Sequence, residues 1–232
     1  PEATGRGVMI ITMEVLDKYK LAPSDVSVAV QGMGNVGSVA ARLLHEKGCK
    51  IVAVSDVSGG IRKADGLNIP EICAFVKQRK LLKDYNADGV EHIDNRALLT
   101  TKCDILIPAA LENQITADIA KELNCRLIIE AANGPTTVEA DAILEKRDIV
   151  VLPDILTNAG GVIVSYCEWV QNLQSLTWDE NDVNATLFKV MTRALTDVYH
   201  KARDYKISYR LAAYAVAIER LCTAKKKRGI FP

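Results

Sequence analysis

Three glycines that follow a short apolar run constrain the fold of this chain more than any other feature of its sequence. The run covers residues 26–31 and is rich in valine, as is typical of a buried strand. Gly32, Gly34 and Gly37 come next, and apolar side chains then recur at helical spacing as far as Gly48. A G-x-G-x-x-G pattern between a strand and a helix indicates a dinucleotide-binding turn. The alternative is a tight glycine turn that holds no ligand.

Each glycine would serve a dinucleotide-binding turn in a different way. Gly32 permits the sharp bend, Gly34 lets a pyrophosphate approach the backbone, and Gly37 lets the helix pack closely on the strand. The N–H groups that begin the helix lie at the positive end of its dipole and would bind the anion. The sequence therefore predicts a phosphate-binding backbone between the strand and the helix.

An acidic residue after the next apolar run bears on the choice of cofactor. Asp56 follows the run at residues 51–54 and lies about 20 residues after the glycines. A carboxylate there accepts hydrogen bonds from the adenosine ribose and repels a 2′-phosphate, which predicts NAD in preference to NADP. Arg62 and Lys63 follow closely and weaken that preference. The alternative for Asp56 is an ordinary surface aspartate.

The spacing of further apolar runs predicts an α/β fold. These runs are separated by polar stretches compatible with helices, and they cover residues 51–54, 105–107, 127–129 and 149–152. Strands that alternate with helices indicate a doubly wound, mostly parallel sheet, which is a Rossmann-like dinucleotide-binding fold. The sheet core is expected over about residues 26–153. Residues 83–91 are expected to form a connecting loop.

After Pro153 the alternation stops, and additional C-terminal helices are expected over about residues 157–226. Apolar periodicity predicts three of them, at residues 159–172, 178–204 and 209–226. Thr177 and Glu180 have the spacing of a capping box ahead of the second. The third is expected to bury the apolar side chains that recur along it, namely Leu211, Tyr214, Ala215, Ile218 and Cys222.

The composition argues against several classes of partner. Lys and Arg together number 29, as do Asp and Glu, so the formal net charge is zero and no global field attracts nucleic acid or a membrane surface. No apolar run approaches the length of a membrane span. The six cysteines form no C-x-x-C pair, which predicts no metal site. Thiols within apolar segments and the lack of a signal peptide indicate a cytoplasmic location.

Four other motifs accompany the glycine loop. They lie at residues 1–7, 108–110, 130–135 and 158–162. Together, and in this order, the five segments resemble the cofactor domain of the glutamate, leucine, phenylalanine and valine dehydrogenase family, and its glutamate-specific members most of all. The resemblance runs from Pro1 to Phe231.

The resemblance implies that residues 1–232 are the dinucleotide-binding domain of a two-domain enzyme. The family's N-terminal domain supplies most of the amino-acid site, the subunit contacts of a hexamer, and the catalytic lysine and aspartate. No catalytic residue is therefore assigned within this chain. Because the chain begins with Pro1 and not with Met, the missing domain is expected upstream.

Two sets of residues are implied to contact the middle of the cofactor. The resemblance places the backbone of Asn35 and Val36 at the pyrophosphate. It also places Ala109 and Ala110 against the cofactor ribose.

Three polar residues are implied at the nicotinamide end. The resemblance places Thr4 at the carboxamide, Asn133 close by, and Asn158 beside the nicotinamide and the substrate. Each has a structural alternative. Thr4 and Asn158 could cap the helices that follow them, and Asn133 could simply form a turn with Gly134.

Two residues one helical turn apart are implied to face the substrate side chain. Val162 and Ser165 match the family's pair, and a serine hydroxyl can donate a hydrogen bond to a γ-carboxylate. The alternative for Ser165 is a buried hydroxyl bonded to its own helix.

The expected activity is the reversible oxidative deamination of an amino acid to its 2-oxo acid and ammonia with NAD, with L-glutamate and 2-oxoglutarate as the preferred pair. The isolated domain is expected to bind the dinucleotide and to catalyse nothing. Two alternatives stay open. One is a leucine, valine or phenylalanine dehydrogenase, and the other is a stand-alone nucleotide-binding regulatory module.

Overall fold

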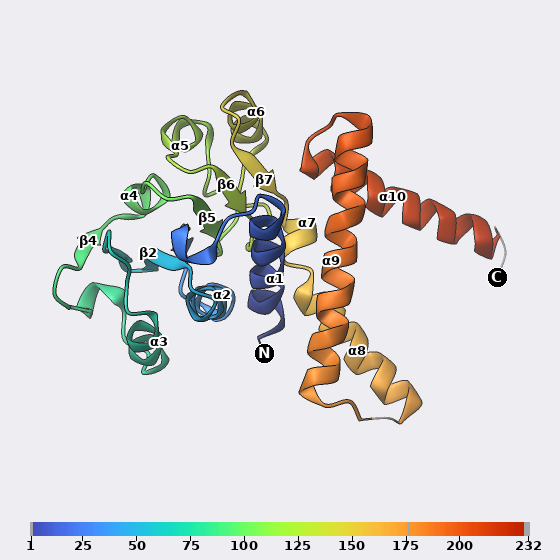
Figure 1. Ribbon diagram of the computed structural model, residues 1–232, viewed down its shortest axis with the longest axis horizontal. Coiled ribbons are helices and arrows are strands. Elements are labelled where there is room, and N and C mark those ends of the chain that lie inside the picture. The colour runs from blue at the N-terminus through green and yellow to red at the C-terminus, as the bar shows by residue number, and fades with distance from the viewer. Residues whose placement is uncertain (1, 176, 230–232) are drawn as a thin grey trace.

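A seven-stranded sheet with helices on both faces forms the centre of the chain in the computed structural model, and three long helices extend to one side of it (Figure 1). The structure describes residues 2–175 and 177–229. Pro1 and Phe231, where the expected family resemblance begins and ends, lie outside the described residues.

The strand order is β4-β3-β2-β1-β5-β6-β7. Five strands are parallel to one another: β1 (Ser27–Gln31), β2 (Lys50–Asp56), β5 (Ile105–Pro108), β6 (Leu127–Ile129) and β7 (Val150–Leu152). Two antiparallel strands, β3 (Gly59–Arg62) and β4 (Glu91–Ile93), extend the edge next to β2. The prediction of a doubly wound, mostly parallel sheet is confirmed.

The two antiparallel strands carry little signal in the sequence. Gly59 and Gly60 begin β3, and glycine weakens the pattern by which a strand is recognised. β4 has only three residues and is largely exposed, so it has no apolar run. Its first residue, Glu91, ends the stretch that was predicted to be a loop, and that prediction is wrong at this residue.

Helices cover both faces of the sheet. One layer contains α1 (Ala3–Lys18), α2 (Asn35–Glu46) and α3 (Ile69–Lys77), and the opposite layer contains α4 (Asn95–Leu99), α5 (Ala117–Glu122) and α6 (Val138–Lys146) (Figure 1). Strand side chains alternate between the layers. Val28 and Val30 of β1 join the core under α1 and α2, while Ala29 joins the core under α4 and α5.

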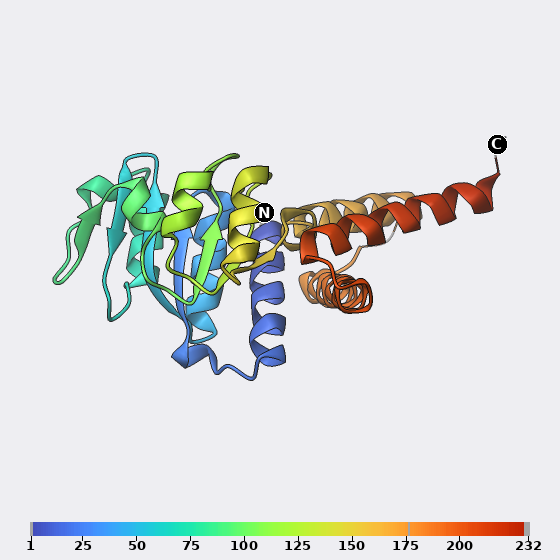
Figure 2. The same cartoon turned by 90° about the horizontal axis from the view of Figure 1, so that it is seen from above.

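The predicted C-terminal helices are present. A short helix, α7 (Asp154–Thr157), leads into α8 (Gly160–Gln174), α9 (Glu180–Tyr205) and α10 (Tyr209–Arg228). α9 packs on α1 through buried side chains that include Leu187 and Met191, whereas α8 and α10 reach away from the sheet (Figure 2). None of the described helices is both long and apolar enough to cross a membrane.

The capping box of α9 lies two residues later than predicted. The Asp179 carboxylate accepts a hydrogen bond from the Asp182 N–H at 2.8 Å, and the Asp182 carboxylate accepts one from the Asp179 N–H at 3.3 Å. The prediction of Thr177 with Glu180 is therefore wrong. An ionised aspartate is a stronger N-cap than threonine, since it also meets the positive end of the helix dipole.

The predicted burial of the α10 face is also wrong. Leu211 and Ile218 are 56% and 58% exposed, Tyr214 and Cys222 are exposed as well, and Ala215 is half-buried. The buried side chains of α10 are those of Ala212 and Ala213. Helical periodicity identifies an apolar face but does not say whether a neighbour covers it, and none of the described residues covers this face along most of α10.

Candidate functional site

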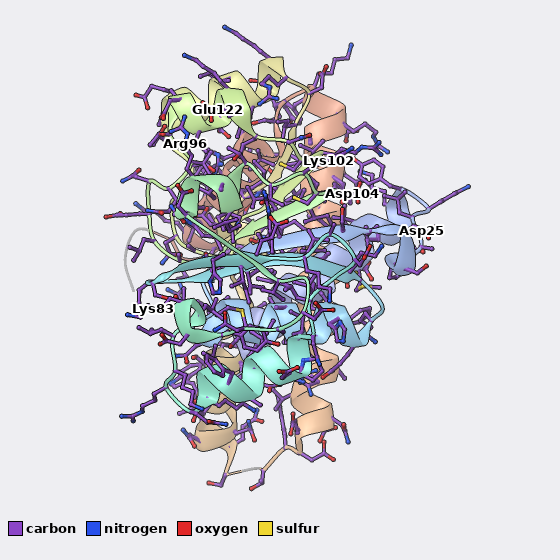
Figure 3. The ribbon with its side chains drawn as sticks, turned by 90° about the vertical axis from the view of Figure 1, so that its left-hand side faces the viewer. Asp25, Lys83, Arg96, Lys102, Asp104 and Glu122 are labelled. Carbon is purple, nitrogen blue, oxygen red and sulfur yellow. The ribbon has the colours of Figure 1, made fainter. Side chains whose placement is uncertain are left out.

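The predicted cofactor residues gather at one edge of the sheet. Asp25 precedes β1 and Asp104 precedes β5, and both lie at the edge of the sheet where the parallel strands begin (Figure 3). Lys83 lies at the opposite edge (Figure 3). Its N–H donates a hydrogen bond to Ser58 Oγ, and the Ser58 hydroxyl donates one to Asp56 in the turn after β2. The parallel strands end at that second edge. β1 there separates β2 from β5, so the chain passes through a topological switch point of the kind at which α/β proteins bind ligands.

Two of the three loop glycines are required by the packing of this chain. Gly32 has φ +94°, and a Cβ there would lie 3.0 Å from the Ala109 carbonyl oxygen. A Cβ at Gly37 would collide with the carbonyl oxygen of Gly32. The Gly32 N–H also donates to Ser55 Oγ at 3.2 Å, which joins the loop to the end of β2.

Gly34 differs from both of its neighbours. Its φ of −75° is one that any residue adopts, and a Cβ there would meet no atom within 4 Å. Packing within the chain therefore does not require glycine at this position. Gly34 is the N-cap of α2, and the first N–H groups of that helix, from Asn35 and Val36, have no acceptor within it. A bare backbone faces open space beside these donors, which fits a bound phosphate.

The amino ends of three helices meet beside the glycine loop. A Cβ at Gly5 of α1 would lie 2.8 Å from the Val36 carbonyl oxygen of α2. A Cβ at Gly160 of α8 would collide with the Ala3 carbonyl oxygen of α1. Because each helix is positive at this end, their convergence favours an anion. The glycines of the motifs at residues 1–7 and 158–162 make these contacts possible.

Thr4 lies at this junction and does not cap α1. The helix has Glu2 as its N-cap, with no side-chain cap hydrogen bond, so the alternative role for Thr4 is wrong. A Cβ at Gly161 would lie 2.7 Å from Thr4 Oγ1. The hydroxyl of Thr4 thus faces the first turn of α8, three residues beyond Asn158.

Asn133 and Asn158 are joined directly. The Asn158 Nδ2 donates to Asn133 Oδ1 at 2.7 Å, although 25 residues separate them. Asn158 is the C-cap of α7, and the N-cap of α8 is Ala159, so the alternative of Asn158 as that N-cap is wrong. Asn133 does precede a turn, since Gly134 has φ +52°. The Asn133 side chain is exposed and that of Asn158 is half-buried, which leaves the pair within reach of a ligand.

Ala109 and Ala110 connect the glycine loop to this asparagine pair. They follow β5, and a Cβ at Gly32 would lie 3.1 Å from Ala110 Cα. The N–H groups of Ala131 and Ala132 donate to the Pro108 carbonyl oxygen at 3.0 and 2.9 Å. The loops after β1, β5 and β6 are therefore in contact with one another along the edge.

Asp56 occupies the expected place but has structural partners of its own. Its Oδ1 accepts hydrogen bonds from the Ser58 N–H at 2.7 Å and from the Ser58 hydroxyl at 2.5 Å, while Oδ2 accepts one from the Leu82 N–H at 2.7 Å. A carboxylate has about four lone-pair sites. These bonds leave room for one further donor on Oδ2, so a ribose contact and the alternative of an ordinary surface aspartate both stay open.

Val162 and Ser165 lie on the solvent-exposed side of α8. Val162 is 75% exposed and Ser165 is exposed too, so the alternative of a buried serine hydroxyl is wrong. The contact between Thr4 and Gly161 places their helical turn next to the site. No other part of the described chain covers them.

A buried ion cluster behind the asparagine pair was missed in the sequence. The Glu130 side chain is fully buried and accepts two hydrogen bonds from the Arg210 guanidinium, at 2.9 and 2.8 Å. Burial opposes the charge of Arg210, but hydrogen bonds to Glu130 and Asp141 keep its pKa above the ordinary value. One signal was available, since a carboxylate at the end of a buried strand needs a cation. The sequence did not say which of the 29 basic residues supplies it.

The cysteines contribute no reactive group to this edge. Cys49, Cys73, Cys103 and Cys167 are buried, and burial raises the pKa of the Cys49 thiol to about 11, so that it stays protonated at neutral pH. Across residues 2–175 and 177–229, no three His, Cys, Asp or Glu side chains are grouped as a metal site would need.

Comparison with known proteins reveals similarity along the whole chain. Residues 1–229 match the family model described as Glutamate/Leucine/Phenylalanine/Valine dehydrogenase. The chain is 49% identical to glutamate dehydrogenase A2 of Halobacterium salinarum, a match that covers 100% of this chain and 55% of that protein. It is 45% identical to NADP-specific glutamate dehydrogenase A1 of the same organism, with 99% and 55% covered. The chain thus spans about half the length of the curated relatives it matches.

A solved structure shares the fold. The hetero-hexameric glutamate dehydrogenase of Thermus thermophilus superposes with a TM-score of 0.89 at 28% sequence identity. The match covers 99% of this chain and 54% of that chain.

The different environments of Gly34 and Gly37 lead to a stability prediction. Gly37→Ala is expected to lower the free energy of unfolding by about 2–3 kcal/mol, because the methyl group overlaps the Gly32 carbonyl. Gly34→Ala is the matched control and should stay within about 0.5 kcal/mol of the wild type. Urea unfolding followed by circular dichroism measures both. Equal stability of the two variants would contradict the packing described here.

Proposed function

Since this chain belongs to the glutamate/leucine/phenylalanine/valine dehydrogenase family, we propose that it is the cofactor-binding domain of a longer amino-acid dehydrogenase. The observation that carries the proposal is the bare backbone at Gly34. The packing of the described residues explains the glycines on either side, whereas no contact among them requires glycine at position 34. A dinucleotide pyrophosphate is the ligand that this position fits.

The proposed cofactor lies along the edge where the parallel strands end. The N–H groups of Asn35 and Val36 would hold the pyrophosphate, with the aligned helix dipoles supporting its charge. Ala109 and Ala110 have small side chains that leave room for the cofactor ribose. Asp56 would accept a hydrogen bond from the adenosine ribose through the remaining site on Oδ2.

The asparagine pair suits the nicotinamide end. A carboxamide presents one N–H₂ group and one carbonyl oxygen. The bond from Asn158 to Asn133 leaves the Asn133 N–H₂ group and the Asn158 carbonyl oxygen for a ligand, which is the complementary set. Thr4, at the adjoining helix junction, adds a hydroxyl. We assign these three residues to the carboxamide and its surroundings.

The bound nicotinamide would take up the hydride that leaves the α-carbon of the amino acid. The residues of this chain would hold the ring and exclude water from one side of it. Val162 and Ser165 would face the substrate side chain from α8, where the serine hydroxyl can donate to a γ-carboxylate. On this basis we propose L-glutamate as the amino acid, with 2-oxoglutarate and ammonia as products.

The exposed apolar residues on α8 support a second domain. Val162, Trp169 and Leu173 are 75%, 56% and 66% exposed, which is unusual for large apolar side chains on one helix. The relatives are about twice as long as this chain. We propose that the rest of the protein covers this face, closes over the substrate and carries the catalytic lysine and aspartate that the family resemblance implies. The family resemblance implies a homo-hexamer for the complete protein, and the glutamate dehydrogenase of Thermus thermophilus, which is hetero-hexameric, supports the hexameric arrangement.

A valine at position 34 tests the cofactor site. Gly34→Val is expected to weaken NAD binding at least about 100-fold, because the branched side chain fills the space that the pyrophosphate needs and leaves it no direct bond to the helix N-terminus. Stability should fall by no more than about 1 kcal/mol, since a Cβ at this position meets no atom within 4 Å and the remaining cost is that of a poorer N-cap. Titration calorimetry measures the affinity, and thermal unfolding is the control. Undiminished NAD binding by a folded Gly34→Val protein would refute this site.

The charge of Asp56 generates a second prediction. The wild-type protein is expected to bind NAD about tenfold more tightly than NADP, since the carboxylate repels a 2′-phosphate, and a tenfold ratio corresponds to about 1.4 kcal/mol. Asp56→Asn keeps an acceptor oxygen for Ser58 and should bring the ratio close to one. Both affinities come from titration calorimetry. Tighter binding of NADP by the wild type would remove Asp56 from its proposed role.

The proposed activity is tested with the complete reading frame. That protein is expected to reduce NAD much faster with L-glutamate than with leucine, valine or phenylalanine, while residues 1–232 alone bind NAD without turnover. The rate of NADH formation measures this. A preference for leucine would contradict the proposal of glutamate as the substrate but would leave the proposal of an amino-acid dehydrogenase unchanged. No NADH from any amino acid would favour a regulatory nucleotide-binding module.

A further inference from the structure

The buried ion cluster lies directly behind the asparagine pair. Arg210, at the beginning of α10, contacts three carboxylates. It pairs with Glu130 at 2.8 Å, with Asp141 of α6 at 2.7 Å, and more distantly with Asp154 of α7 at 3.9 Å. Its side chain is 17% exposed, and that of Glu130 is fully buried. One cation thus connects β6 with three helices.

Stability alone does not account for this cluster. A buried ion pair loses about as much free energy by desolvation as it gains by attraction, so apolar residues of the same volume would hold α10 against the sheet equally well. What a guanidinium adds is geometry, because its planar fork donates to two carboxylates in fixed directions. The cluster therefore specifies where its carboxylates lie.

Glu130 connects the cluster to α7, whose C-cap is Asn158. Its Oε2 accepts a hydrogen bond from the Asp154 N–H at 3.0 Å, at the first residue of α7. Its carbonyl oxygen accepts one from the Thr157 hydroxyl, at the last residue of α7. Both ends of α7 are held by one residue, so the position of Asn158 follows from that of Glu130.

Asp154 connects the cluster to Asn133. Its Oδ2 accepts a hydrogen bond from the Gly134 N–H at 2.7 Å, next to Asn133 in the chain. Asn133 is also only three residues beyond Glu130. Both members of the asparagine pair are thus tied to carboxylates that Arg210 contacts, whereas Arg210 itself does not touch the pair.

We propose that Arg210 is a positioning residue, which sets the relative placement of Asn133 and Asn158 and so the fit of the nicotinamide carboxamide between them. The inference rests on the proposed function for its ligand. The placement of the pair itself does not depend on any ligand. Through Arg210, the beginning of α10 helps to determine the geometry of the nicotinamide end of the site.

The test compares Arg210→Lys with Arg220→Lys in the intact protein. Lysine keeps the charge but cannot make the paired bonds to Glu130 together with the bonds to Asp141. Arg220 is the matched control, since it lies on the same helix and pairs with Asp197 at 2.5 Å on the exposed surface. Titration calorimetry with NAD and with ADP-ribose, which lacks the nicotinamide, separates the two ends of the site.

Arg210→Lys is expected to weaken NAD binding about tenfold, the size of a lost hydrogen bond to the ligand, and to change ADP-ribose binding less than about twofold. Arg220→Lys should leave both affinities unchanged. An equal loss for NAD and ADP-ribose, or no loss for either, would overturn the positioning role, because a general loosening of the domain does not distinguish the two ligands.

A second measurement works without a ligand. The NMR signals of the Asn158 side-chain amide are expected to shift in Arg210→Lys and to stay in place in Arg220→Lys. Unshifted signals in Arg210→Lys would overturn the inference, even if the wild type bound no dinucleotide and the proposed function had failed. If Arg210→Lys does not fold, the double variant Arg210→Gln with Glu130→Gln replaces it, since it removes the charges of Arg210 and of the fully buried Glu130 together, and the same outcomes apply.

Discussion

The contact between the backbones of α2 and β1 is the constraint on which the site depends. Gly37 has no side chain, so the first turn of α2 lies against the Gly32 carbonyl at the end of β1. This contact directs the free N–H groups of α2 toward the topological switch point at the end of β1, which has β2 on one side and β5 on the other. Gly34, between them, is left facing open space. An anion site thus follows from how closely one helix approaches one strand.

Glycines also permit close backbone contacts where α1 and α8 reach the site. Glycines at the beginning of α1 and α8 let α1 touch α2 and let α8 touch α1, so three positive helix ends lie in one region. Behind it, Arg210 and its carboxylates join β6, α6, α7 and α10. The open edge of the sheet is therefore rigid on its inner side, while the outer faces of α8 and α10 are exposed.

Local patterns predicted much of this arrangement. The parallel strands are short apolar runs, and the glycine spacing after β1 predicted both the turn and the helix. The predictions failed where a strand has no apolar run or where distant parts of the chain decide what a side chain contacts. β3 and β4 have no apolar run, and most of the apolar face of α10 is left exposed by the described residues. The sequence also did not show that Ser58 and Leu82 occupy most of the acceptor sites of Asp56.

The sequence by itself determined the alternation of strands and helices, the position of the glycine turn and the family, because each of these depends on residues close together in the chain. Only the tertiary structure decided that Asn133 bonds to Asn158, that Thr4 faces α8, and that Arg210 neutralises Glu130. These pairs are joined across 25 to 157 residues of chain, counting from Thr4 to Gly161 for the longest. The packing of the layers decides which of many possible partners a given side chain contacts. A local sequence pattern does not contain this information.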